Sequence, residues 1–219
     1  MRQYETYRCS VCGNEVEVQS VGEGTLSCCG KEMECITENL TAVNLMKAFA
    51  GESQARNKYE FFAEVAKEEG LHRIARFFQE AADNEKYHAW AEFKAYNKLI
   101  NGVELDSTVK NLQYAADGEN YEHTVMYPNF AKIAKEEDLK DIARLLSAIG
   151  KVEVEHEKEY LALKQVLLDE GFFNSEQDEY YVCEVCGYVH KGKKPPKSCP
   201  LCKAPQEYFK KRCGDIAAG

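Results

Sequence analysis

The sequence predicts a mainly α-helical protein, a four-helix bundle flanked by two small metal-bound modules built of loops and short strands. The ten cysteines form two clusters, five within residues 9–35 and five within residues 183–213. The long middle segment is free of cysteine and rich in Ala, Glu, Lys and Leu at helical spacing. We therefore expect three domains, at residues 1–38, 39–172 and 178–219.

Turn-prone residues divide the middle segment into four predicted helices. Breaks near residues 69–70, 101–102 and 137–138 give helices over 40–69, 71–100, 111–137 and 139–170. The polar segment that follows is expected to be a linker to the last domain. The chain from Ile100 to Leu112 can extend across about 40 Å, the length of a helix of about 25 residues. A crossover between two helical hairpins is therefore feasible.

Charge and hydrophobicity exclude several classes of protein. Residues 1–39, 40–179 and 180–219 carry net charges of −4, −10 and +5. Because no basic face dominates, nucleic acid is not the expected main partner. The apolar stretches are too short to span a membrane, and the N-terminus lacks the apolar core of a signal peptide. We expect a cytoplasmic protein, whose cysteines are metal ligands and not disulfides.

An internal repeat relates the two halves of the middle segment. Residues 62–76 align with residues 130–144 at an offset of 68, and ten of the fifteen positions are identical. The same offset carries Glu85 onto Glu153 and His88 onto His156. The bundle is therefore predicted to consist of two copies of one helical hairpin.

The repeated motif Glu-x-x-His predicts a metal site. Residues three apart are neighbours on a helix, so both side chains of each motif share one face. The other two helices each supply a glutamate at a similar depth. A single Glu-x-x-His motif is more often a solvated helix face, but two repeated copies favour ligands. The set is that of ferritin-like di-iron proteins, and its donors suit iron or manganese: Glu52, Glu85, His88, Glu119, Glu153 and His156.

The third helix departs from the repeat by one extra residue. Glu119 lies eleven residues before Phe130, whereas Glu52 lies ten residues before Phe62. Such an insertion predicts a π-bulge between Glu119 and Tyr127, a feature frequent at functional sites.

The same helix supplies a fifth carboxylate, Glu122. Five carboxylates overcompensate the charge of two ferrous ions, +4, but not that of two ferric ions, +6. We therefore expect neutral His88 and anionic Glu122 to exchange as ligands when the oxidation state changes.

Each cysteine cluster contains four residues at the spacing of a tetrahedral metal site. The spacing is compatible with zinc or iron. The remaining two cysteines, Cys35 and Cys213, are expected to be free thiols. The predicted ligands are Cys9, Cys12, Cys28 and Cys29 in the first cluster and Cys183, Cys186, Cys199 and Cys202 in the second.

These motifs together resemble those of the rubrerythrin family. Residues 7–13 and 24–30 resemble desulforedoxin, and residues 181–209 resemble a rubredoxin-like domain. The motifs around the predicted helical ligands, at residues 50–56, 84–88, 118–123 and 153–156, resemble the di-iron motifs of rubrerythrin. The order of the three parts is that of the desulforubrerythrin branch.

The resemblance implies a peroxidase that reduces hydrogen peroxide to water and protects against oxidative stress. It implies one iron in each terminal domain and a di-iron centre in the bundle. Glu85 and Glu153 would bridge the metals, Glu52 and His156 would be terminal ligands, and Glu119 would accompany His156. Two further residues, Tyr59 and Tyr127, match tyrosines that line the family's site.

The resemblance also implies partners and an assembly. Electrons would come from a flavin-containing NAD(P)H-dependent reductase or a rubredoxin-type donor. The chain would form a homodimer or homotetramer. From the charge split of +5 against −10, we also expect the basic C-terminal domain to dock on an acidic bundle.

Two other functions stay open at this point. A ferritin-like bundle also fits a ferroxidase or iron-handling protein, although storage needs no electron relay. Zinc in the four-cysteine sites would instead give a non-enzymatic scaffold. Metal analysis and visible absorption separate zinc from iron.

Overall fold

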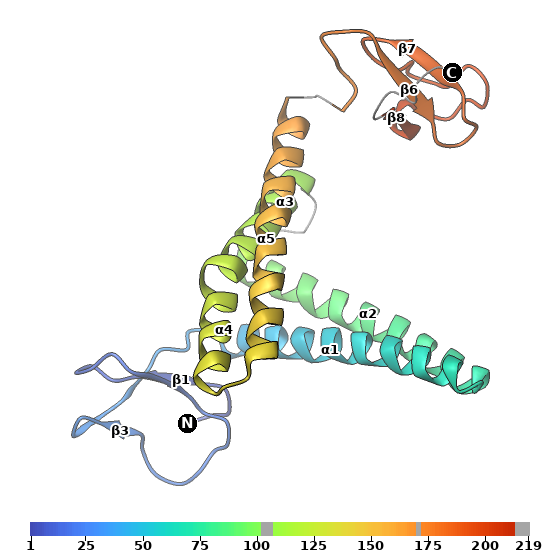
Figure 1. The fold of residues 1–219 in the computed structure, drawn as a ribbon. Helices are drawn as coiled ribbons and strands as arrows, with labels where there is room; N and C mark the ends of the chain where they lie inside the picture. Colours follow the sequence, from blue (N-terminus) through green and yellow to red (C-terminus); the bar gives the residue numbers. More distant parts are fainter. Residues whose placement is uncertain (102–106, 170–171, 213–219) are drawn as a thin grey trace. The chain divides into compact units, whose positions relative to one another are not determined.

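The computed structural model describes residues 1–101, 107–169 and 172–212 and divides into two compact units, residues 1–106 and 107–219 (Figure 1). Each unit contains one helical hairpin and one small strand module. The mainly helical fold class predicted from the sequence is thus confirmed. No helix in the described ranges is both long and apolar enough to cross a membrane.

The N-terminal module consists of short antiparallel strands joined by tight turns. Its three-stranded sheet has the order β2-β1-β5, and a separate hairpin pairs β3 with β4. The Glu5 carboxylate is buried beneath this sheet and accepts hydrogen bonds from Arg2 and Tyr7. The strands are β1 (Thr6–Arg8), β2 (Glu15–Glu17), β3 (Ser27–Cys28), β4 (Lys31–Glu32) and β5 (Glu34–Cys35).

The first hairpin packs α1 (Leu40–Glu68) against α2 (His72–Asn101). Asn39 begins α1, because its side chain accepts a hydrogen bond from the backbone N–H of Ala42 at 3.1 Å. Small buried residues let the two helices approach closely, and Phe49 stacks on Phe93 with ring centroids 4.9 Å apart. The buried alanines of this hairpin are Ala42, Ala63, Ala66, Ala75, Ala82 and Ala89.

The second hairpin contains the predicted π-bulge. The segment η1 (Glu122–Met126) is a π-helix between α3 (Thr108–Tyr121) and α4 (Tyr127–Glu136), and the Tyr127 N–H bonds to the Glu122 carbonyl five residues earlier. Both α3 and α4 pack against α5 (Lys140–Leu168). The prediction of a bulge between Glu119 and Tyr127 is confirmed.

The expected crossover from Ile100 to Leu112 needs a correction. Ser107 caps α3 by accepting a hydrogen bond from the Lys110 N–H, so the helix begins at Thr108 and not at 111. Only seven residue steps then connect the ends of α2 and α3, which reach at most about 25 Å. The connection is therefore five residue steps shorter than the twelve expected between Ile100 and Leu112. Residues 102–106 themselves lie outside the described part of the chain.

The internal repeat extends to the turns and the buried contacts. Gly70 and Asp138, 68 residues apart, both have positive φ, 75° and 59°. After each turn a leucine N–H bonds back to an alanine carbonyl at 2.8 Å, Leu71 to Ala66 and Leu139 to Ala134. Buried Ala63, Ala66 and Ala75 have buried counterparts at Ala131, Ala134 and Ala143. The two hairpins therefore share one design.

The C-terminal module is a three-stranded antiparallel sheet of order β7-β6-β8. Its core is small and consists of Tyr181, Cys183, Cys199 and Phe209. With so few buried side chains, bound metal must supply much of the folding energy. The elements are β6 (Glu179–Cys183), β7 (Val189–Gly192), the short 3-10 helix η2 (Gln206–Tyr208) and β8 (Phe209–Lys211).

Gly150 in α5 offers a test of the close packing in the second hairpin. A Cβ at this position would lie 3.0 Å from the Tyr127 Cβ, so we expect Gly150→Ala to destabilise this unit by about 1–3 kcal/mol. Chemical denaturation of the full chain measures the change. Gly118 is the matched control, since an added Cβ meets nothing within 4 Å there and alanine favours a helix. Equal losses in both variants would contradict the proposed contact.

Candidate metal centres

Two knuckle turns bring the four N-terminal cysteines together. The ligand atoms of Cys9, Cys12, Cys28 and Cys29 all lie within 4.8 Å of one another. The Gly13 N–H bonds to the Cys9 carbonyl at 3.0 Å, and Gly13 and Gly30 adopt φ values of 76° and 75°, which favour glycine. The first turn directs the backbone N–H groups of Val11 and Cys12 at the Cys9 sulfur, and the second is the tight turn of the β3–β4 hairpin. The four cysteines predicted as ligands therefore form a single cluster.

Within the N-terminal cluster, the pKa of Cys9 is lowered and the pKa of Cys28 is raised. Backbone N–H groups of Cys12 and Val11 stabilise the Cys9 thiolate and lower its pKa to about 6. The sulfur contact with Cys12, 3.6 Å away, is the main cause that raises the pKa of Cys28 to about 12. Four thiolates at this distance repel one another, so they ionise together only around a cation. The site thus fits a metal bound by four thiolates.

The C-terminal module repeats this geometry. The ligand atoms of Cys183, Cys186, Cys199 and Cys202 also lie within 4.8 Å of one another. Each knuckle closes on its first cysteine, through N–H bonds from Gly187 to the Cys183 carbonyl at 2.8 Å and from Lys203 to the Cys199 carbonyl at 3.0 Å. Burial acts to raise the pKa of Cys199, but backbone N–H groups lower it to about 6.

The first hairpin brings together one glutamate and one Glu-x-x-His motif. The ligand atoms of Glu52, Glu85 and His88 lie within 4.8 Å of one another, and His88 Nδ1 is 2.7 Å from Glu85 Oε2. Burial, followed by contact with Glu85, raises the pKa of Glu52. Both causes disfavour the ionised form of Glu52, and a cation bound by the two carboxylates would favour it.

The second hairpin forms the equivalent cluster of Glu119, Glu153 and His156, whose ligand atoms again lie within 4.8 Å of one another. His156 Nδ1 is 2.6 Å from Glu153 Oε2 and 4.0 Å from Glu119 Oε2. Burial and the charge of Glu153 raise the pKa of Glu119. Glu153 is itself buried, with 9% of its surface exposed.

Three further predicted residues lie outside these clusters. Glu122 starts the π-helix, and its charge contributes to the raised pKa values of Glu119 and Tyr127. Burial is the larger cause for Tyr127, whose ring faces Gly150. Tyr59 packs against Phe78, with centroids 6.3 Å apart.

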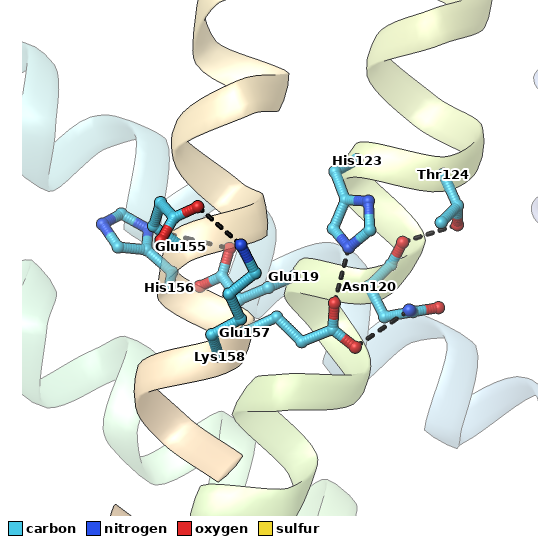
Figure 2. A network of polar contacts seen from close by, with 8 residues as sticks. All are labelled: Glu119, Asn120, His123, Thr124, Glu155, His156, Glu157 and Lys158. Atoms are coloured by element: carbon cyan, nitrogen blue, oxygen red, sulfur yellow. Dashed lines mark hydrogen bonds and ion pairs between the residues drawn. The ribbon is translucent and has the colours of Figure 1, made fainter. Parts of the chain in front are cut away.

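The sequence analysis did not identify the polar network beside the second cluster. Figure 2 shows Asn120 and His123 reaching from the bulged helix to Glu157, which follows His156 in α5. One difference between the two repeats could have indicated this network. At the offset of 68, the first hairpin has Ala89 at the position where the second has Glu157.

The donor chemistry of both helical clusters fits iron. Each cluster offers two carboxylates and one imidazole, which are hard or borderline donors. Burial, followed by the neighbouring carboxylates, raises the pKa values of Glu52 and Glu119, and a bound metal ion would oppose both causes. With the two four-cysteine sites, this defines a class of protein, a non-haem iron protein with glutamate and histidine ligands and thiolate-bound metal centres.

Comparisons with known proteins assign each part of the chain. Residues 43–164 match the family model for rubrerythrin, and residues 181–210 match that for the rubrerythrin rubredoxin-like domain. Residues 1–36 match the desulfoferrodoxin N-terminal domain. The chain belongs to the rubrerythrin family, iron-binding proteins of oxidative-stress defence with a glutamate and histidine di-iron site.

Curated relatives support this assignment over most of their length. Rubrerythrin-1 of Clostridium acetobutylicum is 44% identical over 188 residues, covering 81% of this chain and 96% of the relative. Rubrerythrin of Porphyromonas gingivalis is 46% identical over 180 residues, covering 77% and 88%. A solved structure of partially reduced nigerythrin is 32% identical and covers 78% of this chain and 86% of its own, with a TM-score of 0.30.

Cys28 and Cys35 provide a matched test of the N-terminal centre. We expect Cys28→Ser to remove a ligand, so that the module loses its metal and the visible thiolate absorption of the iron-loaded protein falls. Cys35 is exposed in β5 and lies outside the four-sulfur group, so Cys35→Ser should retain both. Metal analysis per chain measures the outcome, and a loss in Cys35→Ser would contradict the assignment. Cys213 lies outside the described residues.

Proposed function

We propose that this protein is a peroxidase that reduces hydrogen peroxide to water with electrons relayed through its own thiolate-bound iron centres. The observation that carries the proposal is the presence, on one chain, of two four-cysteine sites and two carboxylate and histidine clusters. A ferroxidase or storage protein needs no dedicated electron relay. Reduction of a peroxide needs two electrons, which single-iron centres deliver one at a time.

The proposed di-iron site combines the two helical clusters. Each cluster would supply three donors. Glu85 and Glu153 would be bridging ligands, Glu52, Glu119 and His156 would be terminal ligands, and His88 would bind in the reduced state. Both hairpins leave large apolar side chains exposed at positions related by the repeat, and packing of the two kinds of hairpin would cover them. These exposed pairs are Phe62 and Phe130, Val65 and Ile133, Ile74 and Ile142, and Phe77 and Leu145.

Ligand exchange between His88 and Glu122 remains part of the proposal. When bound, the iron pair supplies two electrons to the peroxide bond, and its charge rises by two. Glu122 then offers an additional negative charge, whereas neutral His88 suits the reduced state. His88 is exposed and bonded only to Glu85 among the described residues, which leaves its ring free to leave the site.

Groups beside the clusters would supply the protons that the reduction of hydrogen peroxide consumes. The balanced reaction takes one hydrogen peroxide, two electrons and two protons to two water molecules. Tyr59 and Tyr127, one on each hairpin, would orient the substrate. The raised pKa of Tyr127 keeps its hydroxyl protonated and able to donate a hydrogen bond.

The electron source and the assembly follow from the same proposal. A flavin-containing NAD(P)H-dependent reductase or a rubredoxin-type protein in the cytoplasm would reduce the thiolate-bound centres. The chain would act as a homodimer or homotetramer. In such an assembly the basic C-terminal module would dock on an acidic bundle, since opposite charges orient the encounter.

Stopped-flow reoxidation of the iron-loaded, anaerobically reduced protein tests the activity. We expect hydrogen peroxide to reoxidise the protein much faster than oxygen does, with two electrons consumed per peroxide. Faster reaction with oxygen would instead indicate a ferroxidase.

Glu85→Gln should abolish this reaction, because it removes a bridging carboxylate. Glu155→Gln is the matched control, since Glu155 is 66% exposed and, within the described part of the chain, paired only with Lys158. We expect it to react at about the wild-type rate. Loss of peroxide reactivity in both variants would contradict the assigned site.

A further inference from the structure

A hydrogen-bonded bridge connects the bulged helix to α5 beside the second cluster (Figure 2). Asn120 Nδ2 donates to Glu157 Oε1 at 2.9 Å, and His123 Nε2 lies 2.6 Å from Glu157 Oε2. Both oxygens of one carboxylate are thus bound to the same turn of the opposite helix. The His123–Glu157 contact is largely shielded, with side-chain exposures of 15% for His123 and 21% for Glu157, whereas Asn120 is exposed.

The bridge holds the backbone on either side of Glu122. Asn120 precedes Glu122 by two residues and His123 follows it directly. The Thr124 hydroxyl donates to the Asn120 carbonyl at 2.6 Å and so satisfies a group beside the bulge. The Glu122 carboxylate, in contrast, has no hydrogen bond or ion pair to any described residue. The main chain is fixed here while the carboxylate is free to move.

The first hairpin is an internal control for this arrangement. At the offset of 68 set by the two Glu-x-x-His motifs, Ala89 stands where the second hairpin has Glu157. At the offset of 67 that relates Glu52 to Glu119, Ala55 stands in place of Glu122. The helix α1 is continuous from Leu40 to Glu68. The bridge, the bulge and the additional carboxylate therefore occur together in one hairpin and are all missing from the described residues of the other.

We propose that Glu157 is a positioning residue that clamps the π-bulge and thereby aims Glu122 at the metal site. In an α-helix one residue corresponds to a rotation of about 100°. If the bulge relaxed or moved along the helix, Glu122 would rotate away from the ligand face. Glu157 prevents this because it binds two side chains of the bulged turn at once. This inference rests on the proposed ligand role of Glu122.

Amide hydrogen exchange of the full-length, iron-loaded and reduced protein tests the clamp. We expect Glu157→Ala, which reproduces the first hairpin at this position, to accelerate exchange at residues 122–127 by about tenfold or more. Asn120→Ala should give a smaller increase in the same segment. Amides of α1, of α2 and of the first half of α5 should be unchanged, which would show that both units remain folded.

Two variants serve as controls for this exchange experiment. Glu155→Ala removes a carboxylate equally close to His156 in sequence, and we expect wild-type exchange. Glu157→Gln keeps groups able to bond to both partners, so it should retain most of the protection. Wild-type protection of residues 122–127 in Glu157→Ala would overturn the proposal, as would equal acceleration in Glu155→Ala.

A double-mutant cycle on redox behaviour tests whether the clamp acts through Glu122. An anionic ligand stabilises ferric iron, so Glu122→Gln should lower the ferric-to-ferrous ratio of the di-iron site at a fixed potential by about tenfold. We expect Glu157→Ala to lower this ratio too, but to add nothing in the Glu122→Gln background. An equal effect in both backgrounds would overturn the positioning role.

The same cycle distinguishes failure of the positioning role of Glu157 from failure of the proposed ligand role of Glu122. If Glu122→Gln leaves the ratio unchanged, then Glu122 is not a redox-dependent ligand and the positioning role is overturned with that part of the proposed function. Hydrogen exchange still reports separately whether Glu157 holds the bulge. If Glu122→Gln changes the ratio and Glu157→Ala does not, the ligand role survives and the positioning role fails.

Discussion

Repulsion between gathered anionic ligands is the constraint on which the rest of the structure depends. Each helical cluster holds two carboxylates and each terminal module holds four sulfur atoms, all within 4.8 Å of one another. Such groups stay together only if a rigid frame or a cation opposes the repulsion. In the hairpins the frame is an interface of buried alanines, which fixes the helices at short distance. In the modules it is a pair of knuckle turns around a very small core.

The four clusters of candidate ligands could be predicted from the sequence because their spacing is local. A Glu-x-x-His motif and a Cys-x-x-Cys pair each specify a geometry within one turn, and the repeat related the two copies. Even the bulge followed from counting residues between Glu119 and Phe130. The start of α3 was mistaken because the cap at Ser107 was not recognised. The clamp by Glu157 was missed because Asn120 and Glu157 are 37 residues apart in the sequence. No short motif encodes a contact between residues so far apart.

The two halves of the helical segment differ in how far they are specialised. The first hairpin has a continuous helix, one imidazole and two carboxylates in its cluster. The second has the same three donors together with Glu122 and the hydrogen bonds that surround the bulge. The additional carboxylate that would respond to a change of oxidation state thus lies on the second hairpin alone. The other side can contribute a ligand, His88, that leaves but no carboxylate that replaces it.

The shared turn geometry at Gly70 and Asp138 has a consequence for the origin of this chain. Two hairpins with the same left-handed turn and the same buried alanines are most simply descended from one duplicated ancestor. A pair of identical, uninterrupted hairpins would have offered four carboxylates, whose charge matches two ferrous ions and falls short of two ferric ions. One inserted residue and the replacement of an alanine by Glu122 in one copy would then have turned a site suited to holding reduced metal into one suited to cycling it.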